Sequence, residues 1–176
     1  MWESYLAKTR ILILGRAAGS LFRYIQDFHG KEIDVIESGS SPSSCNDFAL
    51  LITEDSETAA SFNPNILLNT LKAEEDMLLN AIVAGGVYIF PETAEKSIDL
   101  ETSSVYSRRI AYAAGVYTFA AGTTSLETEM GPVPLLISNP ELLDHLEGVR
   151  LLCQQTGIME EAFYEALMNY SETALS

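Results

Sequence analysis

The chain has 176 residues, of which 47% are hydrophobic and 20% charged, and its 25 acidic and 10 basic residues give a formal net charge of −15. This length and composition fit one globular domain over residues 1–176. The acidic excess argues against nucleic acid and anionic membrane surfaces as partners, because both are bound through clustered lysine and arginine. A small or basic partner fits better.

The two cysteines and the N-terminal sequence indicate the cellular compartment. Cys45 and Cys153 form no CxxC pair, so we expect reduced thiols. The start, MWESYLAKTR, lacks the basic and apolar regions of a signal peptide, and no apolar run approaches the ~20 residues of a membrane-spanning helix. These patterns predict a cytoplasmic protein.

The N-terminal half alternates between short apolar runs and helical patterns. We expect buried strands over residues 11–14 (ILIL), 32–37 (EIDVIE), 48–53 (FALLIT) and 87–90 (VYIF). Apolar residues at helical spacing predict helices over residues 20–28 and 66–83, both followed by glycine.

The C-terminal half starts with an unassigned polar segment, 91–109. Two further strands are expected at 115–122 (GVYTFAAG) and 133–138 (VPLLIS), and two helices at 141–155 and 160–170. Alternating strands and helices predict an α/β fold with three layers and a mostly parallel sheet, of the P-loop or Rossmann-like kind.

The glycines after the first strand are typical of a phosphate-binding loop. In the P-loop, G-x-x-x-x-G-K-[ST], backbone N–H groups surround the phosphates, the lysine contacts their outer oxygens and the hydroxyl binds magnesium. The candidate nucleotide- or anion-binding residues here are Gly15, Arg16, Ala17, Ala18, Gly19 and Ser20. One residue fewer separates the glycines, and no lysine precedes Ser20. The alternative is that small residues only allow close packing of the helix.

The order of the elements resembles the central ATP-binding domain of the Mur ligase family, enzymes that add amino acids to peptidoglycan precursors. The segments that carry the likeness, over about residues 10–170, are DVIESGSS, FALLITEDSETAA, LLNTLKAEEDMLLNAIVAGGVYIFPE and SNPELLDHLEGVRLLCQQTGIMEEAFYEALMNY. The resemblance implies ATP and Mg²⁺ as cofactors. It places Glu37 at the magnesium-binding glutamate, Lys72 near a lysine that is carbamylated in several members, and Asn139 in the H-N-x-x-N motif. Glu37 and Lys72 also fit ordinary solvent-exposed positions.

The chain departs from the family at the positions that carry the family's catalytic residues. The P-loop lysine is missing, Glu54 replaces an asparagine, Ser138 replaces a histidine, and the flanking domains have no counterpart. Such losses remove charge neutralisation and substrate positioning. We therefore expect a non-catalytic binding or regulatory module, a pseudoenzyme, linked to cell-wall metabolism and bound to another protein or a second copy.

Two alternatives stay open. The first is an ATP-dependent ligase subunit whose partner chain supplies the missing domains. The second is an unrelated Rossmann-like nucleotide-binding domain. A zinc site has little support, because His29 and His145 lack metal-ligand spacing. Nucleophilic catalysis has little support either, because Cys45 has no base nearby in the sequence. The adjacent pair at 108–109, both arginine, is expected to contact acidic neighbours or to bind an anion.

Overall fold

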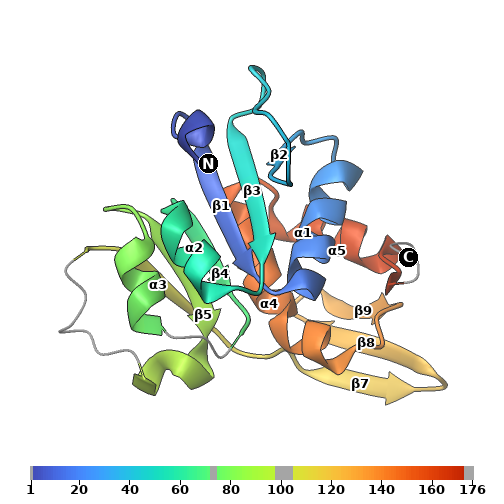
Figure 1. The fold of residues 1–176 in the computed structure, drawn as a ribbon. Coiled ribbons are helices and arrows are strands. Elements are labelled where there is room, and N and C mark those ends of the chain that lie inside the picture. Colours follow the sequence, from blue (N-terminus) through green and yellow to red (C-terminus); the bar gives the residue numbers. More distant parts are fainter. Residues whose placement is uncertain (1, 72–74, 98–104, 173–176) are drawn as a thin grey trace.

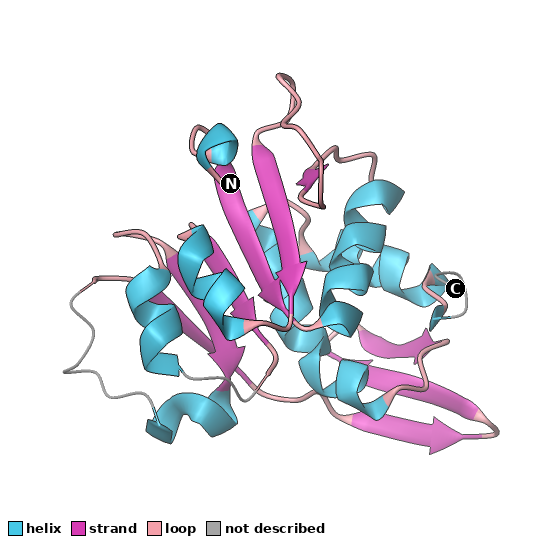
Figure 2. Ribbon diagram, viewed as in Figure 1, coloured by secondary structure: helices cyan, strands magenta, loops and turns pink. Residues whose placement is uncertain are grey.

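The computed structural model describes residues 2–71, 75–97 and 105–172, which form three layers around a parallel sheet (Figure 1, Figure 2). The six strands lie in the order β2-β3-β1-β4-β5-β6, and every neighbouring pair is parallel. They are β1 (Thr9–Leu14), β2 (Asp34–Val35), β3 (Phe48–Thr53), β4 (Ile66–Asn69), β5 (Val87–Pro91) and β6 (Arg108–Tyr112). The predicted three-layer α/β fold is confirmed.

Helices cover both faces of the sheet and create two cores. Within β1, Ile11 and Ile13 belong to one core, and Leu12 and Leu14 to the other. Because successive side chains of a strand point to opposite faces, a strand buried on both sides is apolar throughout. The first core holds α1 (Arg16–Phe28), α4 (Pro140–Gln155) and α5 (Glu160–Asn169). The second holds η1 (Glu3–Tyr5), α2 (Ser56–Phe62) and α3 (Glu75–Ala81), and the short η2 (Glu92–Ser97) follows β5.

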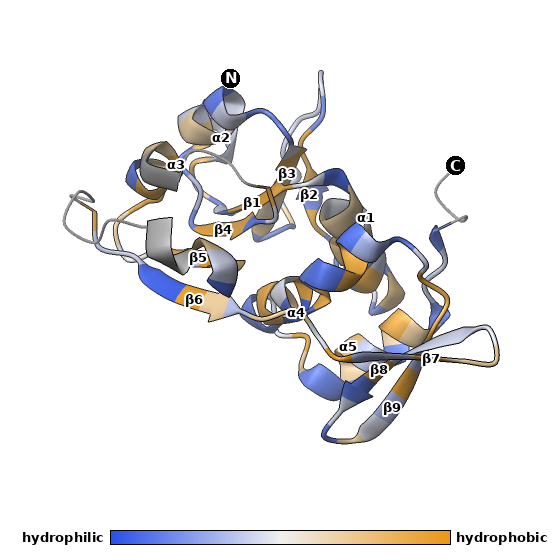
Figure 3. Ribbon diagram, turned by 90° about the horizontal axis from the view of Figure 1, so that it is seen from below, coloured by the Kyte–Doolittle hydropathy of each residue, from blue (hydrophilic) through white to orange (hydrophobic). Residues whose placement is uncertain are grey.

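A small antiparallel sheet lies beside the first core (Figure 1, Figure 3). Its strands, in the order β7-β8-β9, are β7 (Tyr117–Ala120), β8 (Thr123–Thr128) and β9 (Gly131–Leu135). Leu126, Val133 and Leu135 are buried in the first core, so one face of this sheet is held by α4 and α5. The turn between β7 and β8 has φ of 51° at Ala121 and 80° at Gly122, the positive values of a two-residue hairpin loop.

Several elements differ from the sequence-based expectations. The predicted helix over 66–83 is wrong at its start, because residues 66–69 form β4, fully buried between β1 and β5. An apolar run of this kind fits a buried strand as well as a helix, and the parallel neighbours decide. Strands β6 and β8 and helix α2 were not predicted, and β6 begins in the segment left unassigned. Helix α2 is capped by Asp55, whose carboxylate accepts a hydrogen bond from Thr58 N at 2.9 Å.

Within the described residues, no helix combines the length and the apolar character required to cross a membrane.

Candidate functional site

A cavity of about 180 Å³ lies at the carboxyl ends of β1, β3 and β4. It is lined by Gly15, Arg16, Ala17, Ala18, Glu54, Thr70, Glu141, Leu142 and His145. The chain leaves β1 through α1 on one face of the sheet and leaves β3 through α2 on the other. Ligands of open α/β sheets bind at such a switch point, so this cavity is the candidate site.

The N-terminus of α1 forms one wall of the cavity. Helix α1 begins directly after Gly15, and Gly19 N already donates to Gly15 O at 3.1 Å. The backbone N–H groups of Arg16, Ala17 and Ala18 are therefore the first-turn donors that a helix leaves without an intrahelical acceptor. In the described part of the chain no side chain caps this end, which carries the positive pole of the helix dipole.

Close packing accounts for both glycines of the predicted loop. A Cβ on Gly15 would lie 2.0 Å from Thr70 Oγ1, and Gly15 has a φ of 126°. A Cβ on Gly19 would lie 2.6 Å from Cγ2 of Ile52. The glycine spacing thus allows α1 to approach the ends of β3 and β4, as the packing alternative proposed.

The six predicted loop residues separate into two groups. Residues 15–18 line the cavity, whereas Gly19 and Ser20 lie farther along α1 and do not. The predicted start of the helix at Ser20 is wrong, because the backbone is helical from Arg16 onward. A P-loop holds its phosphates in the residues that are helical here.

Among the described residues that line the cavity, carboxylates outnumber cations. Arg16 Nε lies 3.5 Å from Glu54 Oε2, with both side chains largely exposed, and Glu141 adds a second carboxylate. An exposed pair of this kind contributes about 0–1 kcal/mol to stability. This pair nevertheless gives Arg16 an acidic partner within its own chain.

His145 connects the cavity to a buried polar network. A hydrogen bond of 2.7 Å joins His145 Nδ1 to Tyr112 Oη, and Tyr112 also donates to the Asn69 carbonyl at 3.4 Å. Burial lowers the pKa of His145, against the opposing effect of the carboxylates of Asp144 and Glu141. The imidazole is therefore held toward its neutral form.

The remaining predicted site residues lie away from the cavity lining. Asn139 is the N-cap of α4, and its Oδ1 accepts a hydrogen bond from Glu141 N at 3.0 Å. Glu37 follows β2 and is 3.6 Å from Arg23 in an exposed ion pair. Lys72 lies outside the described residues. In the part of the chain that is described, no group of three potential metal ligands comes together.

Five lining residues were not recognised as site residues from the sequence: Glu54, Thr70, Glu141, Leu142 and His145. Two of them carried a usable signal, because Glu54 follows β3 directly and Thr70 follows β4 directly. The carboxyl ends of adjacent parallel strands meet at one edge of the sheet. The three residues of α4 come from a distant part of the sequence and carried no such signal.

The sequence matches no family model and no curated protein, whereas several solved structures share the fold. MurF from Acinetobacter baumannii gives a TM-score of 0.72 at 11% identity, covering 99% of this chain and 49% of that one. The ligase MPL from Neisseria meningitides gives 0.66 at 10% identity, covering 94% and 66%. MurF from Thermotoga maritima in complex with ADP gives 0.65 at 8% identity, covering 96% and 50%.

These matches confirm the resemblance at the level of the fold. The α/β architecture is that of the Mur ligase central domain. The chain spans about half the length of the MurF structures that it matches. The finding favours the Mur-ligase-like interpretation over the unrelated Rossmann-like domain.

Proposed function

We propose that this chain is a non-catalytic Mur-ligase-like domain, a binding or regulatory module that acts in the cytoplasm on cell-wall metabolism. The observation that carries the proposal is the small, acidic cavity at the N-terminus of α1, where a phosphate-binding loop would otherwise begin. The link to the cell wall rests on the fold relatives alone.

The size of the cavity is the first support. Sites for small molecules and cofactors measure roughly 300–1,000 Å³. The cavity here has about 180 Å³, which is below that range. Gly15 and the Thr70 side chain are in close contact at its wall, which narrows the cavity there.

The charge of the cavity is the second support. Phosphate sites concentrate positive charge and backbone N–H groups. Here Glu54 pairs with Arg16, and Glu141 of α4 adds a second carboxylate to the lining. A polyphosphate would meet these carboxylates without the lysine of a P-loop.

The implied cofactors, ATP and Mg²⁺, fit these residues poorly. Glu37, which the resemblance places at the magnesium, is paired with Arg23 and is not part of the cavity lining. We therefore do not extend the ADP binding of the Thermotoga maritima enzyme to this chain, and we propose no ATP-dependent reaction for it.

A thermal-shift titration with ATP, ADP and pyrophosphate, each with and without Mg²⁺, tests the proposal. A ligand that binds only the folded state adds ~2.7 kcal/mol at 100 times its Kd, a shift of roughly 5–10 °C for a chain of this size. We expect no shift at millimolar ligand. A Mg²⁺-dependent rise that the Arg16→Ala variant abolishes would contradict the proposal and favour the ligase-subunit alternative.

A further inference from the structure

Strand β6 is an outer strand of the parallel sheet (Figure 3). It pairs with β5 on one side, where Arg108 N donates to Gly86 O at 2.8 Å. Because the backbone groups of a parallel strand alternate between its two sides, those of Arg108 face β5, and those of Arg109 and Ala111 face away from it. In the described residues no backbone hydrogen bond takes up these outward groups. The edge therefore offers a template for a further strand.

The two arginines of β6 stand out by their lack of partners. Among the arginines and lysines whose side chains the structure describes, Arg108 and Arg109 alone make neither an ion pair nor a side-chain hydrogen bond. The other six contact a carboxylate or a backbone carbonyl: Lys8, Arg10, Arg16, Arg23, Lys31 and Arg150. Acidic residues outnumber basic ones by 25 to 10 in this chain. The expected contact of this pair with acidic neighbours is thus wrong within the described residues, and the expected binding of an anion remains.

The two arginine side chains point to opposite faces of the sheet, because they are adjacent in a strand. Arg108 is exposed and shares its face with Ile110, which packs against the first core. Arg109 is partly buried and lies beside Tyr88 of the second core, its partner on β5. Arg109 Nη1 is buried without a hydrogen-bond partner. Such an enclosed charge is costly, and a carboxylate at the other guanidinium nitrogens would offset that cost.

We propose that β6 binds an acidic, extended segment of a partner protein, which adds to the sheet as a seventh strand. Successive side chains of an extended segment point to opposite faces, so two adjacent carboxylates can meet both arginines, whereas one small anion meets only one of them. Charge selects this occupant over a second copy, because β6 paired with another β6 would bring arginines together. None of these residues lines the cavity at α1, so the inference goes beyond the proposed function.

An exposed tyrosine extends the same surface. Tyr106 is 81% exposed, and its backbone continues the pairing with β5, because Gly85 N donates to Tyr106 O at 2.8 Å. At a spacing of two residues in an extended chain, Tyr106 and Arg108 lie on one face. Tyrosine and arginine are the residue types most enriched among those that dominate binding energy at protein interfaces.

The net charge of −15 does not prevent an acidic segment from binding at this edge. Salt screens charges over about 8 Å at physiological ionic strength, so carboxylates in contact with the two arginines respond to them more than to the charge of the whole chain. The contact should accordingly weaken as salt is added.

An NMR titration of the ¹⁵N-labelled chain with two capped synthetic peptides tests the proposal. One peptide has valine and threonine around a central Glu–Asp pair, and the other has Gln–Asn in that place. The acidic peptide should shift the outward amides of Arg109 and Ala111 and saturate in the millimolar range, and the neutral one should bind at least about fivefold more weakly. Absent shifts up to about 5 mM peptide, equal binding of both peptides, or the same shifts with acetate alone overturn the proposal. Shifts of these amides with protein concentration alone would indicate a second copy and overturn it as well.

Charge variants show whether the arginines carry the binding. Arg108→Gln should raise the dissociation constant of the acidic peptide about tenfold and leave that of the neutral peptide unchanged. Arg23→Gln removes the same charge from an exposed ion pair on α1 and should leave both constants unchanged. Arg109→Gln should act like Arg108→Gln, and if circular dichroism shows it unfolded, the exposed Arg108 decides. Equal weakening by Arg108→Gln and Arg23→Gln, or none by either, overturns the proposal.

Discussion

Tyr112 Oη lies 2.7 Å from His145 Nδ1, and this contact joins the end of β6 to the middle of α4 at the wall of the cavity. Tyr112 is 3% exposed, and a Cβ on Gly148 would lie 2.6 Å from its ring. Tight packing and the hydrogen bond therefore both fix the tyrosine ring, and Tyr112 in turn holds the imidazole of His145 in place.

Removing this hydroxyl should destabilise the fold. Tyr112→Phe keeps the ring but leaves His145 Nδ1 without its partner in a partly buried site. We expect a loss of about 1–2 kcal/mol in the free energy of unfolding, measured in urea at pH 7.5. Tyr164→Phe is a matched control, because Tyr164 donates to the more accessible Glu160 at 3.1 Å. An equal loss in both variants would speak against a specific role of the Tyr112–His145 contact.

The lowered pKa of His145 makes stability depend on pH. The unfolded chain takes up the histidine proton near pH 6.5, whereas the folded chain, in which burial lowers the pKa, resists it to a lower pH. Stability should therefore fall as the pH drops through 6.5. In His145→Asn this part of the pH dependence should disappear, and urea unfolding of both proteins at pH 7.5 and 5.5 provides the comparison.

The glycine at the start of α1 should be irreplaceable for reasons of packing. Gly15→Ala introduces both an unfavourable positive φ and a Cβ that overlaps Thr70 Oγ1. We expect a loss of about 2–5 kcal/mol. Gly39→Ala is the control, because Gly39 has a φ of 82° but open space around it, so only the backbone cost of about 1–3 kcal/mol remains. Similar losses in urea unfolding would contradict the packing explanation.

Four of the six strands of the parallel sheet, β1, β2, β3 and β5, could be predicted from the sequence, because a strand buried on both faces is a short continuous apolar run. Phe48–Thr53 has the predicted bounds. The run Ile66–Asn69 has the same character, but adjoining apolar residues at helical spacing extended it into a false helix. Strand β8, TTSLET, has a single large apolar residue, Leu126, and only its pairing with β7 and β9 defines it.

Only the part of the site that directly follows a predicted strand in the sequence was predictable. Residues 15–18 could be predicted from the strand–glycine–helix order, and they do line the cavity. The sequence could not show that α1 begins at Arg16, because a glycine spacing of this kind fits a loop and a tightly packed helix alike. Nor could it show that α4 packs beside α1 and brings Glu141 and His145 to the same cavity, which depends on tertiary packing.

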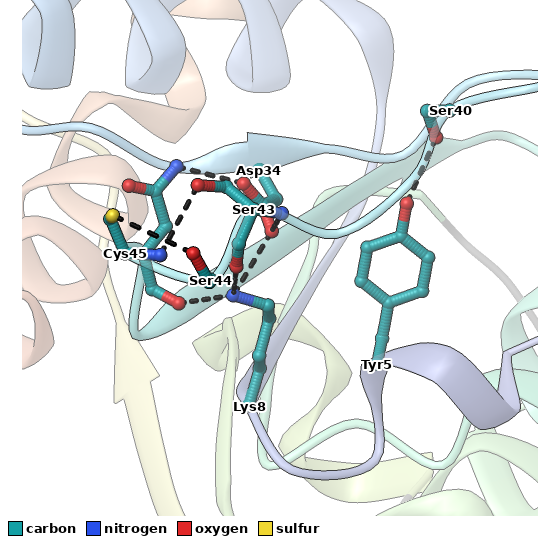
Figure 4. Close-up of polar contacts among 8 residues, drawn as sticks. Tyr5, Lys8, Asp34, Ser40, Ser43, Ser44 and Cys45 are labelled. Carbon is teal, nitrogen blue, oxygen red and sulfur yellow. Dashed lines mark hydrogen bonds and ion pairs between the residues drawn. The ribbon is translucent and has the colours of Figure 1, made fainter.

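An ion pair at the other end of the sheet predicts an acid transition. Lys8 Nζ lies 3.1 Å from Asp34 Oδ2 and donates to the Ser43 carbonyl at 2.7 Å, which anchors the loop between β2 and β3 (Figure 4). Burial acts to raise the pKa of Asp34, but hydrogen bonds from Lys8, Asn46 and Ser43 and the charge of Lys8 hold it below the usual range.

The stabilisation from a lowered carboxyl pKa is present above the unfolded-state pKa of about 3.9 and is lost as the pH falls through the lower folded value. We expect Asp34→Asn to cost about 1–3 kcal/mol at pH 7 and much less at pH 3. Urea unfolding at both pH values measures the difference. An equal cost at both pH values would contradict the ionic contribution.

The two thiols should differ sharply in reactivity. Cys45 is exposed, whereas Cys153 is buried and burial raises its pKa. The folded protein should react with Ellman's reagent at one thiol, and Cys45→Ser should abolish the rapid reaction. Release of both thiols by the folded wild-type protein would contradict the packing of α4 against α1.

The most direct test of the central claim, that the cavity at α1 does not serve a nucleotide, is an NMR titration of the ¹⁵N-labelled chain with ATP and Mg²⁺. The backbone N–H groups of Arg16, Ala17 and Ala18 form the cavity wall and would respond first to a phosphate. We predict that their signals shift no more than that of Gly39 up to millimolar nucleotide. Saturable shifts at these three amides would contradict the proposed function and show that the start of α1 binds phosphate.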